Sequence, residues 1–88
     1  MAKYRVAFSD RAKKEMLSLS EETFNRIAEG CKRLEENPIP DGKHIKKLKG
    51  YESLFRLRVG DYRIVFHWKG SEVNIATILT RQDFGKKY

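Results

Sequence analysis

The 88-residue sequence has a single cysteine and no long apolar run. Cys31 can form no disulfide within the chain, and together with two distant histidines, His44 and His67, it cannot complete a four-ligand zinc site. No apolar stretch approaches the roughly 18 residues that a membrane span needs, and residues 1–8 contain no signal-peptide core. We therefore expect a cytoplasmic protein with no disulfide, no structural metal and no cofactor.

Acidic residues are scarce in one part of the chain. The whole sequence carries 19 Lys and Arg against 12 Asp and Glu. Residues 41–69 hold eight basic and three acidic residues, which is +5 of the total net charge of +7. A local excess of this kind is typical of a surface that binds a polyanion, most often nucleic acid. The alternative is a charge excess that serves only solubility.

The first forty residues predict one strand and two helices. Residues 4–8 alternate as a strand does, and Ser9 and Ser20 can each cap the helix that follows. Residues 37–40, Asn-Pro-Ile-Pro, end the second helix. The apolar residues of that helix recur with helical spacing, at Phe24, Ile27, Ala28, Cys31 and Leu34. Because Cys31 belongs to this stripe, we expect a packed core thiol rather than a reactive one.

The second half of the chain has the period of two that is typical of strands. The dipeptides Gly60-Asp61 and Gly70-Ser71 are turn signals that divide it into three antiparallel strands, and a weaker extended stretch at 44–49 can add another. The expected fold class is therefore α+β, in one domain over residues 1–88. It is an antiparallel-rich, twisted sheet of four to five strands, with the N-terminal two-helix hairpin packed on one face.

The two turns predict which residues share a face of the sheet. If both are two-residue loops, Arg58 faces Arg63 and Val65 faces Ala76. The core face then holds apolar and aromatic residues: Phe55, Leu57, Val59, Tyr62, Ile64, Phe66, Trp68, Val73, Ile75 and Leu79. The opposite face holds the arginines and the remaining positions: Arg56, Arg58, Arg63, Val65, His67, Asn74, Ala76 and Ile78.

The pairing of Arg58 with Arg63 places like charges opposite each other, which costs roughly 0.2–1 kcal/mol. An anion held between the two side chains would remove this cost. Arginine suits such a role, because its planar fork matches phosphate oxygens and stays charged at all working pH values. Together with Arg56, the pair can grip successive phosphates or stabilise one phosphate in a transition state. The alternative is a solvated face on which long, screened side chains splay apart.

Residues 48–66, Leu-Lys-Gly-Tyr-Glu-Ser-Leu-Phe-Arg-Leu-Arg-Val-Gly-Asp-Tyr-Arg-Ile-Val-Phe, resemble the signature stretch of the RelE/ParE toxin superfamily. Residues 4–14, Tyr-Arg-Val-Ala-Phe-Ser-Asp-Arg-Ala-Lys-Lys, and the two expected helices resemble its N-terminal half. The resemblance spans essentially the whole chain and is more specific to the superfamily than to either branch. RelE toxins are ribosome-dependent endoribonucleases that cut messenger RNA and are held inactive by an antitoxin. ParE toxins share the fold but bind DNA gyrase.

The resemblance implies site residues. Arg56 and Arg58 match the basic pair on the strand before the tight turn, where archaeal-type members also carry arginine and some RelE toxins carry lysine. Arg63 matches the basic residue just after the turn, and Arg81 matches the one that ends the last strand. Tyr88 matches a C-terminal tyrosine that stacks on a base. This basic set favours the RelE branch, while a ParE-like gyrase poison and a non-catalytic RNA-binding module remain the alternatives.

Other polar residues of the basic stretch are expected to have supporting roles. His67 could act as a general base, as histidine does in some relatives, but its position beyond Val65 favours a structural or antitoxin-contacting role. His44 and Glu52 lie in loops and receive no role. Four lysines form a strip that either is solvated or faces ribosomal RNA: Lys43, Lys46, Lys47 and Lys49.

The resemblance also implies a mechanism and partners. Cleavage without a metal requires the RNA 2′-oxygen to attack the adjacent phosphate, and arginine, with a pKa above about 12, can assist only through its charge. The expected partners are messenger RNA, the ribosome and a cognate RelB-like antitoxin in a hetero-oligomer, with no membrane. We expect the antitoxin, as an acidic amphipathic helix or strand, to cover the helical hairpin or the sheet face. Apolar residues on that face motivate the expectation: Leu54, Val65, Ala76 and Ile78.

Overall fold

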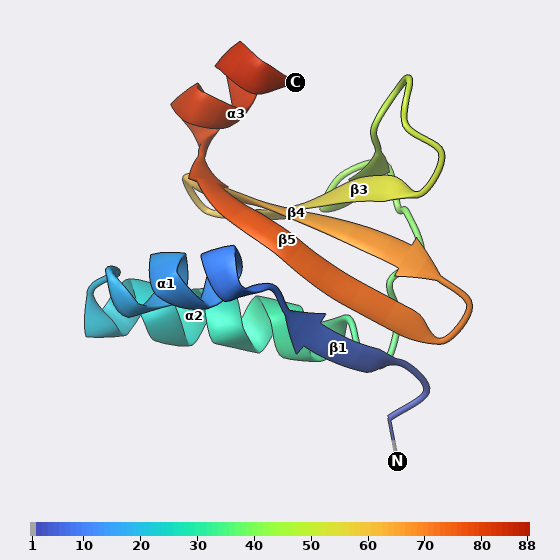
Figure 1. Ribbon diagram of the computed structural model, residues 1–88, viewed down its shortest axis with the longest axis horizontal. Helices are drawn as coiled ribbons and strands as arrows, with labels where there is room; N and C mark the ends of the chain where they lie inside the picture. Colours follow the sequence, from blue (N-terminus) through green and yellow to red (C-terminus); the bar gives the residue numbers. More distant parts are fainter. Residues whose placement is uncertain (1) are drawn as a thin grey trace.

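The computed structural model describes residues 2–88 as one sheet with helices on both sides (Figure 1). The elements follow in the order β1 (Arg5–Phe8), α1 (Asp10–Leu17), α2 (Glu21–Arg33), β2 (Ile45–Lys47), β3 (Leu54–Val59), β4 (Tyr62–Lys69), β5 (Glu72–Thr80) and α3 (Arg81–Lys87). The α+β class is confirmed, and the weak stretch at 44–49 does supply a strand. No helix among residues 2–88 is long and apolar enough to cross a membrane.

The five strands lie in the order β1-β5-β4-β3-β2. β1 pairs with β5 in parallel, and the other neighbours are antiparallel. The first and last strands of the chain are therefore side by side, and α1 and α2 carry the chain from the β1 edge toward the β2 edge. The sequence pattern predicted a strand over residues 4–8, close to the observed β1, but not its place beside β5, because that pairing joins residues far apart in the chain.

The core lies between the sheet and the α1–α2 hairpin. Ser9 and Ser20 begin the two helices as predicted, since their hydroxyls accept hydrogen bonds from the backbone N–H of Ala12 and Thr23. Cys31 is buried in this core, and burial raises the pKa of its thiol to about 12. The prediction that Cys31 packs in the core is confirmed, and its lack of reactivity remains a prediction.

The two glycine turns set the register as predicted, with one exception in β5. Arg58 lies opposite Arg63. In the next hairpin Phe66 lies opposite Ile75, but Val65 lies opposite Thr77, so Ala76 is an extra residue at a β-bulge. The predicted pairing of Val65 with Ala76 was therefore wrong.

The bulge exchanges the faces of the residues that follow it. Because side chains alternate, one extra residue turns each later side chain to the other face. Ile78 lies opposite Ile64 and belongs to the core, whereas Leu79 lies opposite Arg63. The prediction that Leu79 is in the core and Ile78 on the other face was wrong for this reason.

Contacts with α1 hold β5 in the bulged conformation. Beyond the end of β1, the Ser9 hydroxyl donates to the Ala76 carbonyl at 2.7 Å. The Glu15 carboxylate accepts from the Thr77 hydroxyl at 2.9 Å and from the Ile78 N–H at 2.8 Å. These side chains satisfy backbone groups of β5 that the short β1 leaves unpaired. The bulge thus depends on residues about 60 positions away in the sequence.

The C-terminal helix α3 was not among the predicted elements. The Thr80 hydroxyl accepts a hydrogen bond from the Asp83 N–H at 3.1 Å, and Asp83 lies in the first turn. The spacing Thr-x-x-Asp is a helix-start signal that could have revealed it. In Figure 1, α3 lies above the sheet and the α1–α2 hairpin below it, and α3 contacts β4 and β5. The face opposite the hairpin is therefore bordered by α3.

Candidate nucleic-acid interface

Four arginines converge on the face of the sheet opposite the α1–α2 hairpin. β3 carries Arg56 and Arg58, and β4 carries Arg63, which lies directly opposite Arg58 as predicted. Arg81 is the first residue of α3 rather than a strand residue, and its backbone N–H donates to the Asp61 carbonyl at 2.7 Å. That bond joins the start of α3 to the β3–β4 turn. One turn, two strands and one helix therefore bring the basic residues together.

Two of the arginines are anchored and two are free to reach a ligand. Arg63 is 9% exposed, and its Nη1 donates to the Gly60 and Tyr62 carbonyls at 3.0 Å. Arg56 is partly buried, and its Nη1 donates to the backbone carbonyl of His44 at 3.0 Å. Arg58 and Arg81 are exposed, and within residues 2–88 their guanidinium groups have no hydrogen-bond partner.

The arginines destabilise one another's charged forms. The pKa of Arg63 is lowered by desolvation first, and then by the positive charges of Arg58 and Arg81. The pKa of Arg56 is lowered by desolvation and then by Arg63 and Arg58. In the described part of the chain, none of the four forms an ion pair with a carboxylate. A bound anion would relieve this repulsion, and phosphate matches the guanidinium fork.

Aromatic side chains lie at the C-terminal rim of this face. Tyr88 stacks on Phe84 of α3 with ring centroids 5.2 Å apart. Its ring also lies edge-on to Tyr51, from the loop between β2 and β3, at 5.8 Å. Both tyrosines are exposed, so their rings can accept an unstacked base. Tyr51 belongs to no periodic pattern, so nothing in the sequence predicted a role for it.

The predicted lysine strip is exposed but does not lie on one face. Lys46 pairs with Arg56, whereas Lys47 pairs with Phe55 of the core face. Lys43 and Lys49 lie in the loops on either side of β2. The lysines therefore surround the edge strand, where they can attract a polyanion from either side.

His67 is not part of the arginine cluster. It is exposed and lies opposite Leu54, near the far end of β4. It lies four positions after Arg63, which corresponds to about 13 Å along a strand. The expectation that it is not the central base remains a prediction.

The prediction that apolar residues are exposed among the arginines was wrong. Leu54 and Val65 are only 6% and 0% exposed, and Ile78 faces the core because of the bulge. Exposed apolar surface lies on the helical hairpin instead, where Leu17 is 81% exposed. Beside it, a groove of about 320 Å³ has an almost entirely apolar lining that includes Phe24.

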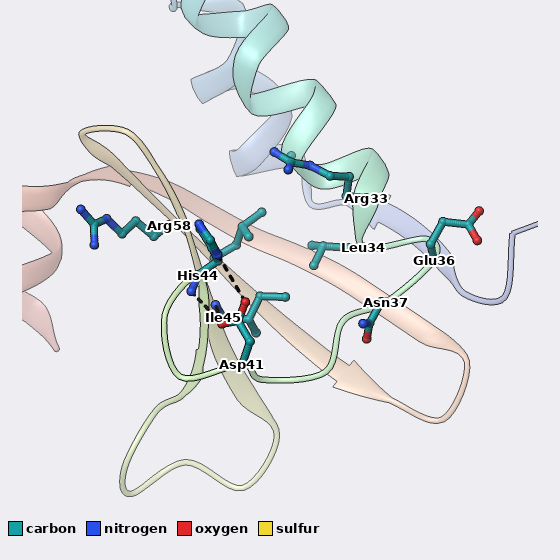
Figure 2. A pocket seen from close by; sticks show the side chains of 10 residues that line it. Arg33, Leu34, Glu36, Asn37, Asp41, His44, Ile45 and Arg58 are labelled. Atoms are coloured by element: carbon teal, nitrogen blue, oxygen red, sulfur yellow. Dashed lines mark hydrogen bonds and ion pairs between the residues drawn. The ribbon is translucent and has the colours of Figure 1, made fainter.

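A second polar cluster lies where the end of α2 meets β2 and β3. Asp41 and His44 line a pocket of about 330 Å³ there, together with Arg33 and Arg58 (Figure 2). Backbone hydrogen bonds, mainly from Ile45, hold the pKa of the Asp41 carboxyl well below its usual range. The sequence pattern predicted no role for His44 or for Asp41. Among residues 2–88, no three His, Cys, Asp or Glu side chains cluster in a way that could hold a metal ion.

Comparisons with known proteins agree on the family. Residues 6–83 match the family model described as the ParE toxin of the type II toxin–antitoxin system parDE. The chain is 31% identical over 83 residues to the putative toxin RelE1 of Methanocaldococcus jannaschii, covering 91% of this chain and 92% of that protein. It is 44% identical over 62 residues to the toxin RelE3 of the same organism, covering 69% of this chain and 62% of that protein.

A solved structure agrees with these relatives. The archaeal RelE–RelB complex of Pyrococcus horikoshii OT3 contains a chain that superimposes with a TM-score of 0.75 at 32% sequence identity, covering 90% of this chain and 96% of that one. Although the family model carries the ParE name, the relatives and this structure carry the RelE name. The chain therefore belongs to the RelE/ParE family of toxins of type II toxin–antitoxin systems, and within it to the RelE-type toxins.

Proposed function

We propose that this toxin is a ribosome-dependent endoribonuclease that cleaves messenger RNA and thereby inhibits translation. The observation that carries the proposal is the cluster of Arg56, Arg58, Arg63 and Arg81, which share one region and have no carboxylate partner among the described residues. The repulsion within the cluster favours a multiply charged anionic ligand, and an RNA backbone supplies one phosphate per nucleotide.

The proposed chemistry is attack of the RNA 2′-oxygen on the adjacent phosphate. As the 2′-hydroxyl loses its proton, its oxygen forms a bond to phosphorus and the bond from phosphorus to the departing 5′-oxygen breaks. The departing oxygen takes up a proton from water, which leaves a 2′,3′-cyclic phosphate and a 5′-hydroxyl. The exposed Arg58 and Arg81 contact the phosphate. Arg63 and Arg56, whose guanidinium groups are fixed by backbone carbonyls, add positive charge near it. This route needs no metal-bound nucleophile, so we expect cleavage to survive chelation while the ribosome stays intact.

The remaining residues bind the RNA rather than act on the reacting phosphate. Tyr88 offers an exposed ring for stacking on a base, which helps to force the nucleotides into line. The lysines around β2 attract ribosomal or messenger RNA, and their contribution should fall as salt is added. A ribosome-dependent activity requires a cytoplasmic protein, so we propose that location as well.

We also propose that a cognate RelB-like antitoxin binds the toxin in a hetero-oligomer. The RelE chain of Pyrococcus horikoshii was solved as a complex with RelB. In this chain we propose that the antitoxin covers the exposed apolar surface around Leu17 and Phe24 of the helical hairpin, because its burial removes apolar area from water. Covering it would stabilise a small domain by mass action. If Leu17→Ser and Phe24→Ser together leave co-purification with the antitoxin unchanged, this part of the proposal is wrong.

The experiment that tests the activity is mapping of RNA 5′ ends after brief induction in cells. Wild type should produce new 5′-hydroxyl ends within translated messages, and Arg63→Ala should not, although its circular dichroism spectrum is unchanged. The ParE name of the matching family model makes DNA gyrase the second candidate target. Gyrase trapped on DNA, with messages intact, would favour that target. Binding of RNA with neither result would favour a passive RNA-binding module.

A further inference from the structure

The proposed cleavage requires a group that can take a proton from the RNA 2′-hydroxyl. The four arginines are unsuited to this, because a guanidinium with a pKa above about 12 cannot be deprotonated under working conditions. His67 lies on the same face but near the far end of β4 from Arg63. We propose that His44, oriented by Asp41, is the proton-transfer group of this site, an inference that rests on the proposed function.

Asp41 is fixed by the backbone of its own loop. Its Oδ1 accepts three N–H hydrogen bonds, from Lys43 at 2.9 Å, His44 at 2.7 Å and Ile45 at 3.0 Å. These bonds hold the carboxylate in one place and favour its charged form, so it stays ionised at neutral pH. A rigid, charged acceptor is what is needed to orient an imidazole.

The second oxygen of Asp41 orients the His44 ring. Oδ2 lies 3.3 Å from Nδ1 of His44, and dashed lines join the two residues in Figure 2. A carboxylate at Nδ1 favours the tautomer that carries its proton there, which leaves Nε2 as a proton acceptor. The His44 side chain is 59% exposed, so a substrate can reach Nε2.

The backbone of His44 is tied to the arginine cluster. Its carbonyl accepts from the Arg58 N–H at 2.8 Å and from Nη1 of Arg56 at 3.0 Å. Strand β3 and the loop at residues 41–44 therefore meet at the His44 carbonyl. The backbone N–H of Arg58 thus links β3, which carries two of the four arginines, to the residue that carries the imidazole.

The pocket next to His44 has room for part of a nucleotide. Its volume of about 330 Å³ lies within the range of small-molecule sites, which begins at about 300 Å³. Charged groups from α2, the segment after it, the His44 loop and β3 line this pocket: Arg33, Glu36, Asp41 and Arg58. Arg56 bonds to the His44 backbone carbonyl, and Asp41 contacts the ring itself. The positive members favour a phosphate there, and Asp41 supplies the orienting charge.

A purely structural role makes a different prediction. The turn at residues 41–45 is closed by backbone N–H donors, and the His44 ring contributes nothing to those three bonds. If the ring served only to support the loop, replacing it would alter stability and not the dependence of cleavage on pH. The two roles can therefore be separated by kinetics.

The test is single-turnover cleavage on programmed ribosomes across pH 5–9, with wild type, His44→Gln, Asp41→Asn and His67→Gln. The wild-type rate should rise across roughly pH 5–8, the window in which imidazole groups change charge. His44→Gln should lose about 10²–10⁴-fold of the rate and the dependence on pH in this window. Asp41→Asn keeps an oxygen for the backbone donors but lacks the charge, so an intermediate loss is expected. Added imidazole should restore part of the rate to His44→Ala.

Each alternative has a distinct outcome. If His44→Gln keeps the wild-type rate and pH profile while Arg63→Ala is inactive, the proton-transfer role of His44 is wrong and the proposed nuclease activity stands. The same conclusion holds if His67→Gln, the matched histidine control, loses the rate instead. If wild type cleaves no RNA on ribosomes, the proposed function fails, and the role of His44 fails with it. Circular dichroism of each variant confirms that the fold is retained.

Discussion

Replacing Arg58 with methionine should make the protein more stable and much less active. Arg58 is exposed, lies directly opposite Arg63 and lowers the pKa values of both Arg63 and Arg56. Its guanidinium has no hydrogen-bond partner among the described residues, so its removal breaks no bond. Methionine keeps an unbranched apolar stem of similar length and removes the charge.

The two effects have different sizes and opposite signs. Relief of a like-charge cross-strand pair is worth roughly 0.2–1 kcal/mol, which in a domain of this length raises Tm by about 1–8 °C. The gain should shrink at high salt, because exposed charges are screened. Loss of one charged group at the reacting phosphate should slow cleavage by about 10²–10³-fold.

Urea unfolding at low and high salt measures the first effect, and single-turnover cleavage on programmed ribosomes measures the second. Arg5→Met is the matched control, since it removes the same charge from β1, where Arg5 lies 3.5 Å from Glu72. That variant should cleave at the wild-type rate and lose at most about 1 kcal/mol. A less stable Arg58→Met that still cleaves normally would show that Arg58 serves the fold and not the phosphate.

Three further predictions concern the fold itself. Cys31, whose buried thiol has a pKa raised to about 12, should react with iodoacetamide at pH 8 only after the protein is unfolded, as mass spectrometry can show. Glu15→Ala should lower the free energy of unfolding by about 1–3 kcal/mol in urea titrations, because it leaves donors of β5 without a partner. The pKa of Asp41 is depressed in the folded state, so its contribution to stability is present above the unfolded pKa of about 4 and is lost as the pH falls. Thermal melts of Asp41→Asn should therefore differ from wild type at pH 7 and converge with it in acid.

Local signals were sufficient for much of the architecture. Ser9 and Ser20 cap their helices through bonds to residues three positions ahead, and such short-range contacts can be read directly from a sequence. The glycine turns are equally local. Gly60 and Gly70 have φ values of 56° and 61°, which favour glycine, and the tight turns place Arg58 opposite Arg63.

Features that depend on distant residues could not be predicted in this way. The Ala76 bulge is stabilised by Ser9 and Glu15, which are separated from β5 by most of the chain. A period-two pattern contains no mark of such an interruption, so Leu79 and Ile78 were assigned to the wrong faces.

Some residues of the candidate site are likewise set by local sequence, and others by contacts between distant segments. The sequence by itself determined that Arg56, Arg58 and Arg63 share a face, because two adjacent strands joined by a short turn permit only one register. Only the tertiary structure decided that Arg81 joins them, since this depends on where β5 ends and on the bond from Arg81 to the β3–β4 turn. The position of His44 was likewise decided by tertiary structure, because its carbonyl is held by a strand that begins ten residues later.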